Sequence, residues 1–163
     1  MLQVHVRTPA EASEQEQAAF LRMVPEGGAM TEAAVRAGLP LAEALVICAE
    51  DGQILGVAAL KVPKPGYRAG LGAAAKSGFA LAEAGFPREL GYLAVDVPWR
   101  GRGIGTALCA EVIRLAGGRG LFATTGDDIM RHKILPGLGF ADAGTGWQGR
   151  LEPVHLMVRP GQG

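Results

Sequence analysis

Residues 89–116 read ELGYLAVDVPWRGRGIGTALCAEVIRLA, and this stretch decides the fold. Residues 89–97 are apolar enough for a buried strand, which Pro98 ends because proline lacks a backbone N–H group. Three glycines and two arginines then fall between Arg100 and Gly105. From Thr106 onward, apolar residues recur with the spacing of a helical face. The pattern predicts a strand, a glycine-rich turn and a helix.

A glycine-rich turn in front of a helix is suited to binding phosphate groups, because several backbone N–H groups and the positive end of the helix dipole converge there. A P-loop is excluded, since Thr106 and Ala107 follow the last glycine where that motif needs lysine and then serine or threonine. A dinucleotide-binding fold is favoured by Asp127, which stands about 20 residues beyond the turn, where an acid would hold the ribose. Against it, a predicted antiparallel hairpin precedes the turn, and too few residues follow for a doubly wound sheet.

Composition limits the class of protein. The 163 residues are enough for one domain with a sizeable core, and 48% of them are hydrophobic, which argues against disorder. Sixteen basic residues balance sixteen acidic ones, so we expect no nucleic acid and no anionic membrane as a partner. We also expect no membrane-spanning segment and no signal peptide. Cys48 and Cys109 form no spaced framework, which favours reduced thiols in a cytoplasmic protein.

The sequence before this stretch predicts a strand, two helices and a hairpin. Thr8-Pro9-Ala10-Glu11 matches a capping box and predicts a helix that continues to about Val24. Asp51-Gly52 is a strong signal for a tight turn between two antiparallel strands. The other expected elements are a strand at 3–7, a helix at 31–37, and strands at 45–49 and 54–62.

Residues 63–88 are expected to form a helical insertion. The segment is rich in alanine, and its apolar spacing predicts a helix from Ala69 to Ala84 that three glycines weaken. One interpretation is a packed helix that covers a sheet edge or forms the face of a homodimer. The other interpretation is a mobile lid over a substrate pocket.

After the central stretch, the sequence predicts a strand from Leu121 to Thr125. Asp127 or Asp128 can cap a following helix that runs to about Leu135. Two further strands are expected at 147–151 and 154–158.

These features together resemble the GNAT N-acetyltransferase superfamily. Arg100-Gly101-Arg102-Gly103-Ile104-Gly105 is similar to the acyl-CoA signature of that family, and Leu93 to Pro98 looks like its fourth strand. Leu138-Gly139-Phe140 matches a recurrent ending of the helix after strand five. The order of elements matches over nearly the whole chain. The resemblance implies one α/β domain over residues 1–163, with a mixed, mostly antiparallel sheet that is flanked by helices and split at strands four and five.

The resemblance also implies which residues bind acetyl-CoA. The backbone of the turn would hold the pyrophosphate, and strand four would pair with pantetheine, with one N–H group polarising the thioester carbonyl. Arg100 and Arg102 would add positive charge, although a merely solvated Arg102 is the alternative. The expected coenzyme-binding residues are Leu93, Ala94, Val95, Arg100, Gly101, Arg102, Gly103, Ile104, Gly105 and Thr106.

Acetyl transfer needs a general base, because an amine is protonated at neutral pH and attacks only after losing a proton. Glu89 opens strand four, where some members of the family carry a base glutamate. With regular alternation, Glu89 shares a face with the other odd-numbered residues up to Val95. A solvated glutamate at a strand start is the alternative.

The usual general acid of the family is missing. Many members place a tyrosine where this chain has Leu135. His132, one turn earlier, could protonate the leaving thiolate or could be a surface histidine. Unassisted departure is a third option, since a thiol with a pKa near 8.5 is a tolerable leaving group. The sequence has no cluster with metal-ligand spacing, so we expect no metal. It also has no glycine-flanked serine that would suggest an acyl-enzyme, and Cys109 sits within the helix after the turn, which favours direct transfer without a covalent intermediate.

The sequence thus predicts transfer of an acetyl group from acetyl-CoA to an amine-bearing small molecule or peptide in a ternary complex. The way the family builds its acceptor pocket nominates residues 25–31, the insertion and Trp147. The alternative is a non-catalytic acyl-CoA-binding or sensor module that kept the turn and lost the acid.

Overall fold

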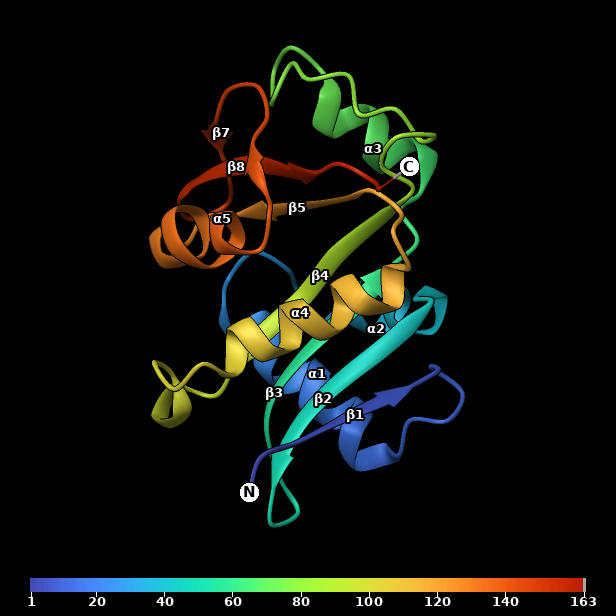
Figure 1. The fold of residues 1–163 in the computed structure, drawn as a ribbon, viewed down its shortest axis with the longest axis vertical. Coiled ribbons are helices and arrows are strands. Elements are labelled where there is room, and N and C mark those ends of the chain that lie inside the picture. The colour runs from blue at the N-terminus through green and yellow to red at the C-terminus, as the bar shows by residue number, and fades with distance from the viewer. Residues whose placement is uncertain (163) are drawn as a thin grey trace. The chain divides into compact units, whose positions relative to one another are not determined.

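The computed structural model describes residues 1–162, and Figure 1 shows the order of its elements. Gly163, the last residue of the predicted domain, lies outside the described residues. Internal contacts group the chain into two compact units. The first comprises Met1–Lys61 and Leu90–Leu115, and the second comprises Val62–Glu89 and the chain from Ala116 onward. Within residues 1–162, no helix has the length and apolar character needed to cross a membrane.

Eight strands in the described part of the chain form a mixed sheet with the order β1-β2-β3-β4-β5-β8-β6, and β7 pairs with β8. Only β4 and β5 are paired in parallel among the described registers, and that ladder joins Arg88 to Leu121 and Glu89 to Phe122. A parallel ladder this short is what a sheet split at strands four and five requires. The predicted α/β class with a mostly antiparallel sheet is therefore confirmed. The strands are β1 Gln3–Arg7, β2 Ala44–Glu50, β3 Gln53–Lys61, β4 Arg88–Val95, β5 Leu121–Thr125, β6 Ala141–Asp142, β7 Trp147–Gln148 and β8 Pro153–Arg159.

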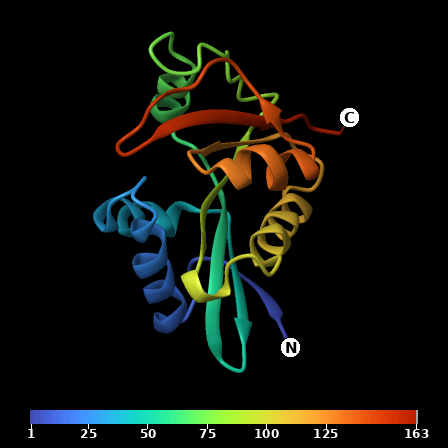
Figure 2. The same ribbon diagram turned by 90° about the vertical axis from the view of Figure 1, so that its left-hand side faces the viewer.

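In the first unit, helices cover both faces of the antiparallel pair β2 and β3 (Figure 2). On one face, Phe20 of α1 and Val35 of α2 pack with Leu45 and Val57 in a buried cluster. On the other face, Ile104 and Leu108 of α4 approach Gly56 so closely that its missing side chain is what admits them. The helical elements of this unit are α1 Glu14–Glu26, α2 Glu32–Gly38, α4 Ile104–Ala116 and the short 3₁₀ turns Leu39–Leu41 and Val97–Trp99.

The first helix begins later than the sequence predicts. The Ser13 hydroxyl accepts from the Glu16 N–H, and the Glu16 carboxylate accepts from the Ser13 N–H, so this pair forms the capping box of α1. The expected box at Thr8 closes a turn instead, in which the Thr8 N–H donates to the Glu11 carboxylate at 2.8 Å. Both segments carry the same motif, and the later one begins the helix.

Strand β4 contains a residue in the left-handed conformation. Tyr92 has φ 50°, a backbone state that a tyrosine adopts only when its surroundings hold it there. Its ring is buried in the core cluster of the first unit, and the Lys61 ammonium lies 4.2 Å from the ring centroid. Ala94 packs against the same cluster as Tyr92. The predicted shared face of Glu89 with the odd-numbered residues up to Val95 stays a prediction.

In the second unit, the insertion has a shorter helix than its alanine content predicts. Helix α3 spans Pro65–Gly72, and residues 73–87 form turns and irregular backbone. Gly72 ends the helix where a side chain would press against the Phe79 carbonyl oxygen. The remaining helical turns of this unit are the π-helical Met130–Ile134 and α5 Leu135–Gly137.

The insertion packs against the second unit's strands. Leu71 and Leu81 share a buried cluster with Phe122 of β5 and Leu156 of β8. The Thr145 N–H also donates to the Ser77 carbonyl at 2.9 Å, which ties the insertion to the loop before β7. These contacts favour the interpretation of a packed cover over that of a mobile lid.

The close contact between Tyr92 and Gly38 allows a test of how the Tyr92 ring is packed. A Cβ on Gly38 would overlap the Tyr92 hydroxyl oxygen but would lie 3.4 Å from the next ring atom, Cζ. We expect Gly38→Ala to lower the free energy of unfolding by about 1–3 kcal/mol through overpacking, although alanine favours the helix. In a Tyr92→Phe background the loss should disappear, and a double-mutant cycle measured by urea unfolding checks this. Equal losses in both backgrounds would contradict the packing.

Candidate functional site

The turn that follows β4 is built from two glycines in the left-handed conformation. Gly101 has φ 77° and Gly103 has φ 83°, so a residue with a side chain would be strained at either position. Helix α4 begins at Ile104, two residues earlier than the predicted start at Thr106. The Ala107 N–H donates to the Gly103 carbonyl at 3.0 Å and closes the first turn of the helix. The N–H groups before Ala107 lie at the helix start, where backbone donors have no intrahelical acceptor.

The space in front of these glycines is open. A Cβ built on Gly101 or on Gly103 would meet no atom within 4 Å. A side chain at either position would occupy the space from which an anion approaches the backbone donors. Exposed glycines, unpaired helix-start donors and the helix dipole together fit phosphate oxygens. Binding of an anion by the residues from Gly101 to Thr106 stays a prediction that this geometry favours.

Each of the two arginines of the turn has a defined contact. The Arg100 Nε donates to the Val95 carbonyl at 3.0 Å, which anchors this exposed side chain to the end of β4. The Arg102 guanidinium lies 4.8 Å from the Trp99 ring centroid. These contacts hold two positive charges beside the glycines.

The end of β4 leads directly into this turn. Leu93, Ala94 and Val95 are half-buried, and the Asp96 N–H donates to the Leu55 carbonyl of β3 at 2.8 Å. The strand is therefore fixed by β3 immediately before the chain reverses into α4. All predicted coenzyme-binding residues belong to the first unit.

Glu89, the predicted base, belongs to the second unit. Its side chain is buried, with 3% of its surface exposed, so the alternative of a solvated glutamate does not fit. The Tyr67 hydroxyl donates to Glu89 Oε2 at 3.0 Å. Sequence reasoning gave Tyr67 no role, because it lies 22 residues before Glu89 in a segment without a recognised motif. The one available signal was its rarity, since the chain has two tyrosines.

His132 and Leu135 lie on the helical segment after β5. His132 is exposed on the π-helical turn, and Leu135 is buried, with 1% of its surface exposed. Arg131 holds this turn to β6 through two hydrogen bonds to Asp142, and this partner lowers the pKa of the Asp142 carboxyl. Leu135 has an aliphatic side chain, so it cannot donate a proton to the leaving group.

Asp127 has a structural role. Its carboxylate accepts from the Met130 N–H at 2.9 Å and caps the helical segment, as the sequence predicts. This cap accounts for Asp127 without a ribose, so the residue no longer argues for a dinucleotide-binding fold.

The cysteines do not favour an acyl-enzyme. Both are buried and free, and burial raises the pKa of the Cys109 thiol to about 12. Burial also raises the pKa of Cys48. The reactive thiolate form is therefore scarce at neutral pH. Within residues 1–162, no group of three or more His, Cys, Asp or Glu side chains is placed to hold a metal ion.

Comparisons with known proteins agree on one family. The family model described as the acetyltransferase (GNAT) family matches residues 13–132, which is more than half of the chain. No curated protein sequence matches.

Solved structures share the fold at low sequence identity. An acyl-CoA N-acyltransferase from Pseudomonas aeruginosa is 15% identical with a TM-score of 0.71, over 98% of this chain and 99% of that chain. A ribosomal-protein-alanine N-acetyltransferase from Brucella melitensis is 20% identical with a TM-score of 0.64, over 96% and 99%. A GNAT family acetyltransferase from Elizabethkingia anophelis with acetyl-CoA bound is 15% identical with a TM-score of 0.62, over 98% and 97%.

The match to the family model covers the capped first helix, the antiparallel hairpin, β4 and the whole glycine turn. The signature residues thus lie where the fold places its exposed helix-start donors. The chain belongs to the GNAT acetyltransferase family.

Proposed function

We propose that this protein transfers an acetyl group from acetyl-CoA to a primary amine by direct attack in a ternary complex. The observation that carries the proposal is the open, left-handed glycine turn between β4 and α4. The solved relative from Elizabethkingia anophelis holds acetyl-CoA, which supports the choice of anion. In this chain the donors of residues 101–106 would bind the pyrophosphate, and Arg100 and Arg102 would add charge.

The backbone of β4 would position the thioester. Pantetheine would pair with the backbone of Leu93, Ala94 and Val95, and a backbone N–H there would stabilise negative charge that develops on the carbonyl oxygen. Because a backbone donor is fixed by the strand, it needs no reorganisation during the reaction. Acetyl-CoA supplies the activated acetyl group, and the chain supplies orientation.

Glu89 would be the general base. It would accept a proton from the ammonium form of the acceptor, and the freed amine nitrogen would bond to the acetyl carbon. The bond between that carbon and sulfur breaks, and coenzyme A leaves as the thiolate. The nitrogen then gives its second proton to water and becomes a neutral amide, and the thiolate takes a proton from water. Leu135 offers no acid and His132 is exposed, so holding both substrates together would account for most of the acceleration.

The acceptor would lie against the second unit. Two of the segments that the sequence nominates, the insertion and Trp147, pack against the same buried cluster of that unit. The candidate acceptors are amine-bearing small molecules and peptides. The Brucella melitensis relative acts on the alanine of a ribosomal protein, so peptides with an N-terminal alanine belong in any panel of acceptors.

Binding of acetyl-CoA can be tested with a matched pair of glycine variants. Gly103 and Gly52 both have φ near +80°, and both face open space, but Gly52 lies in the β2–β3 hairpin turn. Alanine at either position should cost about 1 kcal/mol of unfolding free energy. We expect Gly103→Ala to weaken acetyl-CoA binding by about tenfold or more, measured by isothermal titration calorimetry, and Gly52→Ala to bind as the wild type does. Equal affinities for the two variants would contradict the placement of the pyrophosphate.

Catalysis can be tested by release of coenzyme A. Wild-type protein with acetyl-CoA and a panel of polyamines, amino sugars, arylalkylamines and alanine-first peptides should release free thiol with at least one acceptor. Glu89→Gln should lower kcat by about 100-fold or more while acetyl-CoA affinity stays the same. Glu14→Gln, an exposed change on α1, serves as the control. If the wild type binds acetyl-CoA but releases no coenzyme A with any acceptor of the panel, the non-catalytic sensor is favoured. Full activity of Glu89→Gln would exclude Glu89 as the base.

A further inference from the structure

The chain has two tyrosines, and they occupy different environments. Tyr92 is buried in the core of the first unit, with 6% of its surface exposed. Tyr67 lies on α3 of the insertion, with 40% of its surface exposed, and its hydroxyl reaches Glu89. The contact joins a half-accessible phenol to a carboxylate that is otherwise buried. The insertion therefore delivers a hydrogen-bond donor to the proposed base.

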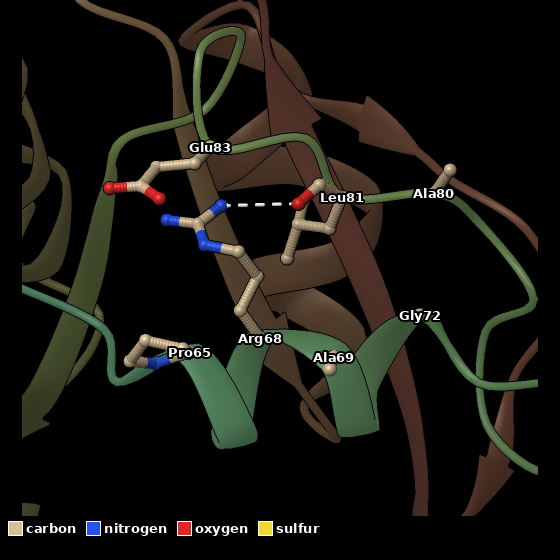
Figure 3. Close-up of a pocket in the computed structure, with 7 residues that line it drawn as sticks. All are labelled: Pro65, Arg68, Ala69, Gly72, Ala80, Leu81 and Glu83. Carbon is tan, nitrogen blue, oxygen red and sulfur yellow. Dashed lines mark hydrogen bonds between the residues drawn. The ribbon is translucent and has the colours of Figure 1, made fainter.

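The helix that carries Tyr67 is held in place by the next residue. Arg68 is buried, and its Nη1 donates to the Leu81 carbonyl at 3.3 Å and to the Phe86 carbonyl at 2.7 Å. Figure 3 shows the Arg68 side chain reaching from α3 across a small pocket to Leu81. These bonds fasten α3 to the segment that leads into β4 and Glu89.

Arg68 and Glu89 are also linked through β5. The Arg68 guanidinium lies 5.4 Å from the ring centroid of Phe122, and Phe122 is the register partner of Glu89 in the β4–β5 ladder. The same ladder that fixes the backbone of Glu89 thus supports the residue that fixes α3. Arg68 anchors the helix that carries Tyr67, and the β4–β5 ladder anchors the backbone of Glu89. The hydrogen bond between Tyr67 and Glu89 therefore joins two segments that are each fixed within the second unit.

We propose that Tyr67 is a positioning residue for Glu89, and that its hydroxyl holds the carboxylate in one orientation from the inserted helix. The proposal rests on the proposed function, because it concerns the base of the same reaction. Tyr67 acts through Glu89 and is not assigned contact with acetyl-CoA or with the acceptor.

The hydrogen bond has a direct electrostatic consequence. Burial disfavours the ionised form of a carboxylate, and a donated hydrogen bond favours that form. Charged groups of neighbouring residues include Arg68, which lies over Phe122, Arg88, whose Nη1 donates to the Pro87 carbonyl, and Glu83, which lines a pocket with Arg68. Removing only the Tyr67 hydroxyl should therefore make Glu89 easier to protonate.

A spectroscopic titration tests the inference without turnover. Full-length protein with isotope-labelled glutamate carboxyl groups is titrated by NMR in the presence of acetyl-CoA, and the Glu89 signal is assigned by its loss in Glu89→Gln. We expect Tyr67→Phe to move the Glu89 titration midpoint up by about one pH unit. Tyr92→Phe, which removes the hydroxyl buried in the first unit, should leave that midpoint in place. An unchanged midpoint in Tyr67→Phe overturns the proposal.

The pH dependence of turnover gives a second readout with the best amine of the panel. In Tyr67→Phe the acidic limb of kcat/KM should move to higher pH, the KM for acetyl-CoA should stay the same, and activity should return at alkaline pH. A merely structural role would lower activity equally at every pH, and that result would overturn the proposal. Full activity of Glu89→Gln would instead refute the base assignment, whereas the titration midpoint would still report on the Tyr67 contact.

Discussion

Two glycines in the left-handed conformation turn the chain from β4 into α4, and the proposed coenzyme site depends on this reversal. Gly101 and Gly103 adopt φ values near +80° in front of open space, so the backbone itself is the proposed binding surface. Packing of Ile104 and Leu108 against Gly56 fixes the direction of the helix behind the turn. The place of the proposed site therefore follows from the direction in which α4 leaves the turn to cover the sheet.

The residues proposed for catalysis lie in a different unit of the chain from the glycine turn. The residues proposed to bind the coenzyme belong to the first unit, whereas Glu89, Tyr67 and the buried Leu135 belong to the second. Backbone donors at a helix start suit any acyl-CoA enzyme, and they carry no information about the acceptor. Specificity for an amine must come from side chains. In this chain, the inserted segment of residues 63–88 can contribute some of them. The fold is shared at identities of 15–20% with solved proteins whose names give different acceptors or none.

Local patterns made much of the fold predictable from the sequence. Strand β5 has its predicted bounds, and Asp51 and Gly52 both take the positive φ values of a tight hairpin turn. Two capping boxes stand close together, and local sequence could not decide that Ser13 begins the helix. Tyr92 adopts a left-handed backbone conformation that tyrosine normally avoids. Its ring packs against Gly38 and Lys61, so tertiary packing and not local sequence explains this conformation. The contact of Tyr67 with Glu89 joins distant residues, and periodicity cannot reveal it.

The most direct test of the account is a map of which backbone N–H groups respond to acetyl-CoA. Proton–nitrogen correlation spectra of the isotope-labelled full-length protein should be recorded with and without a saturating amount of acetyl-CoA. We expect the largest shifts at the amides from Gly101 to Thr106, with a second set at Leu93, Ala94 and Val95. Saturating binding that leaves the amides of the turn unchanged would contradict this expectation.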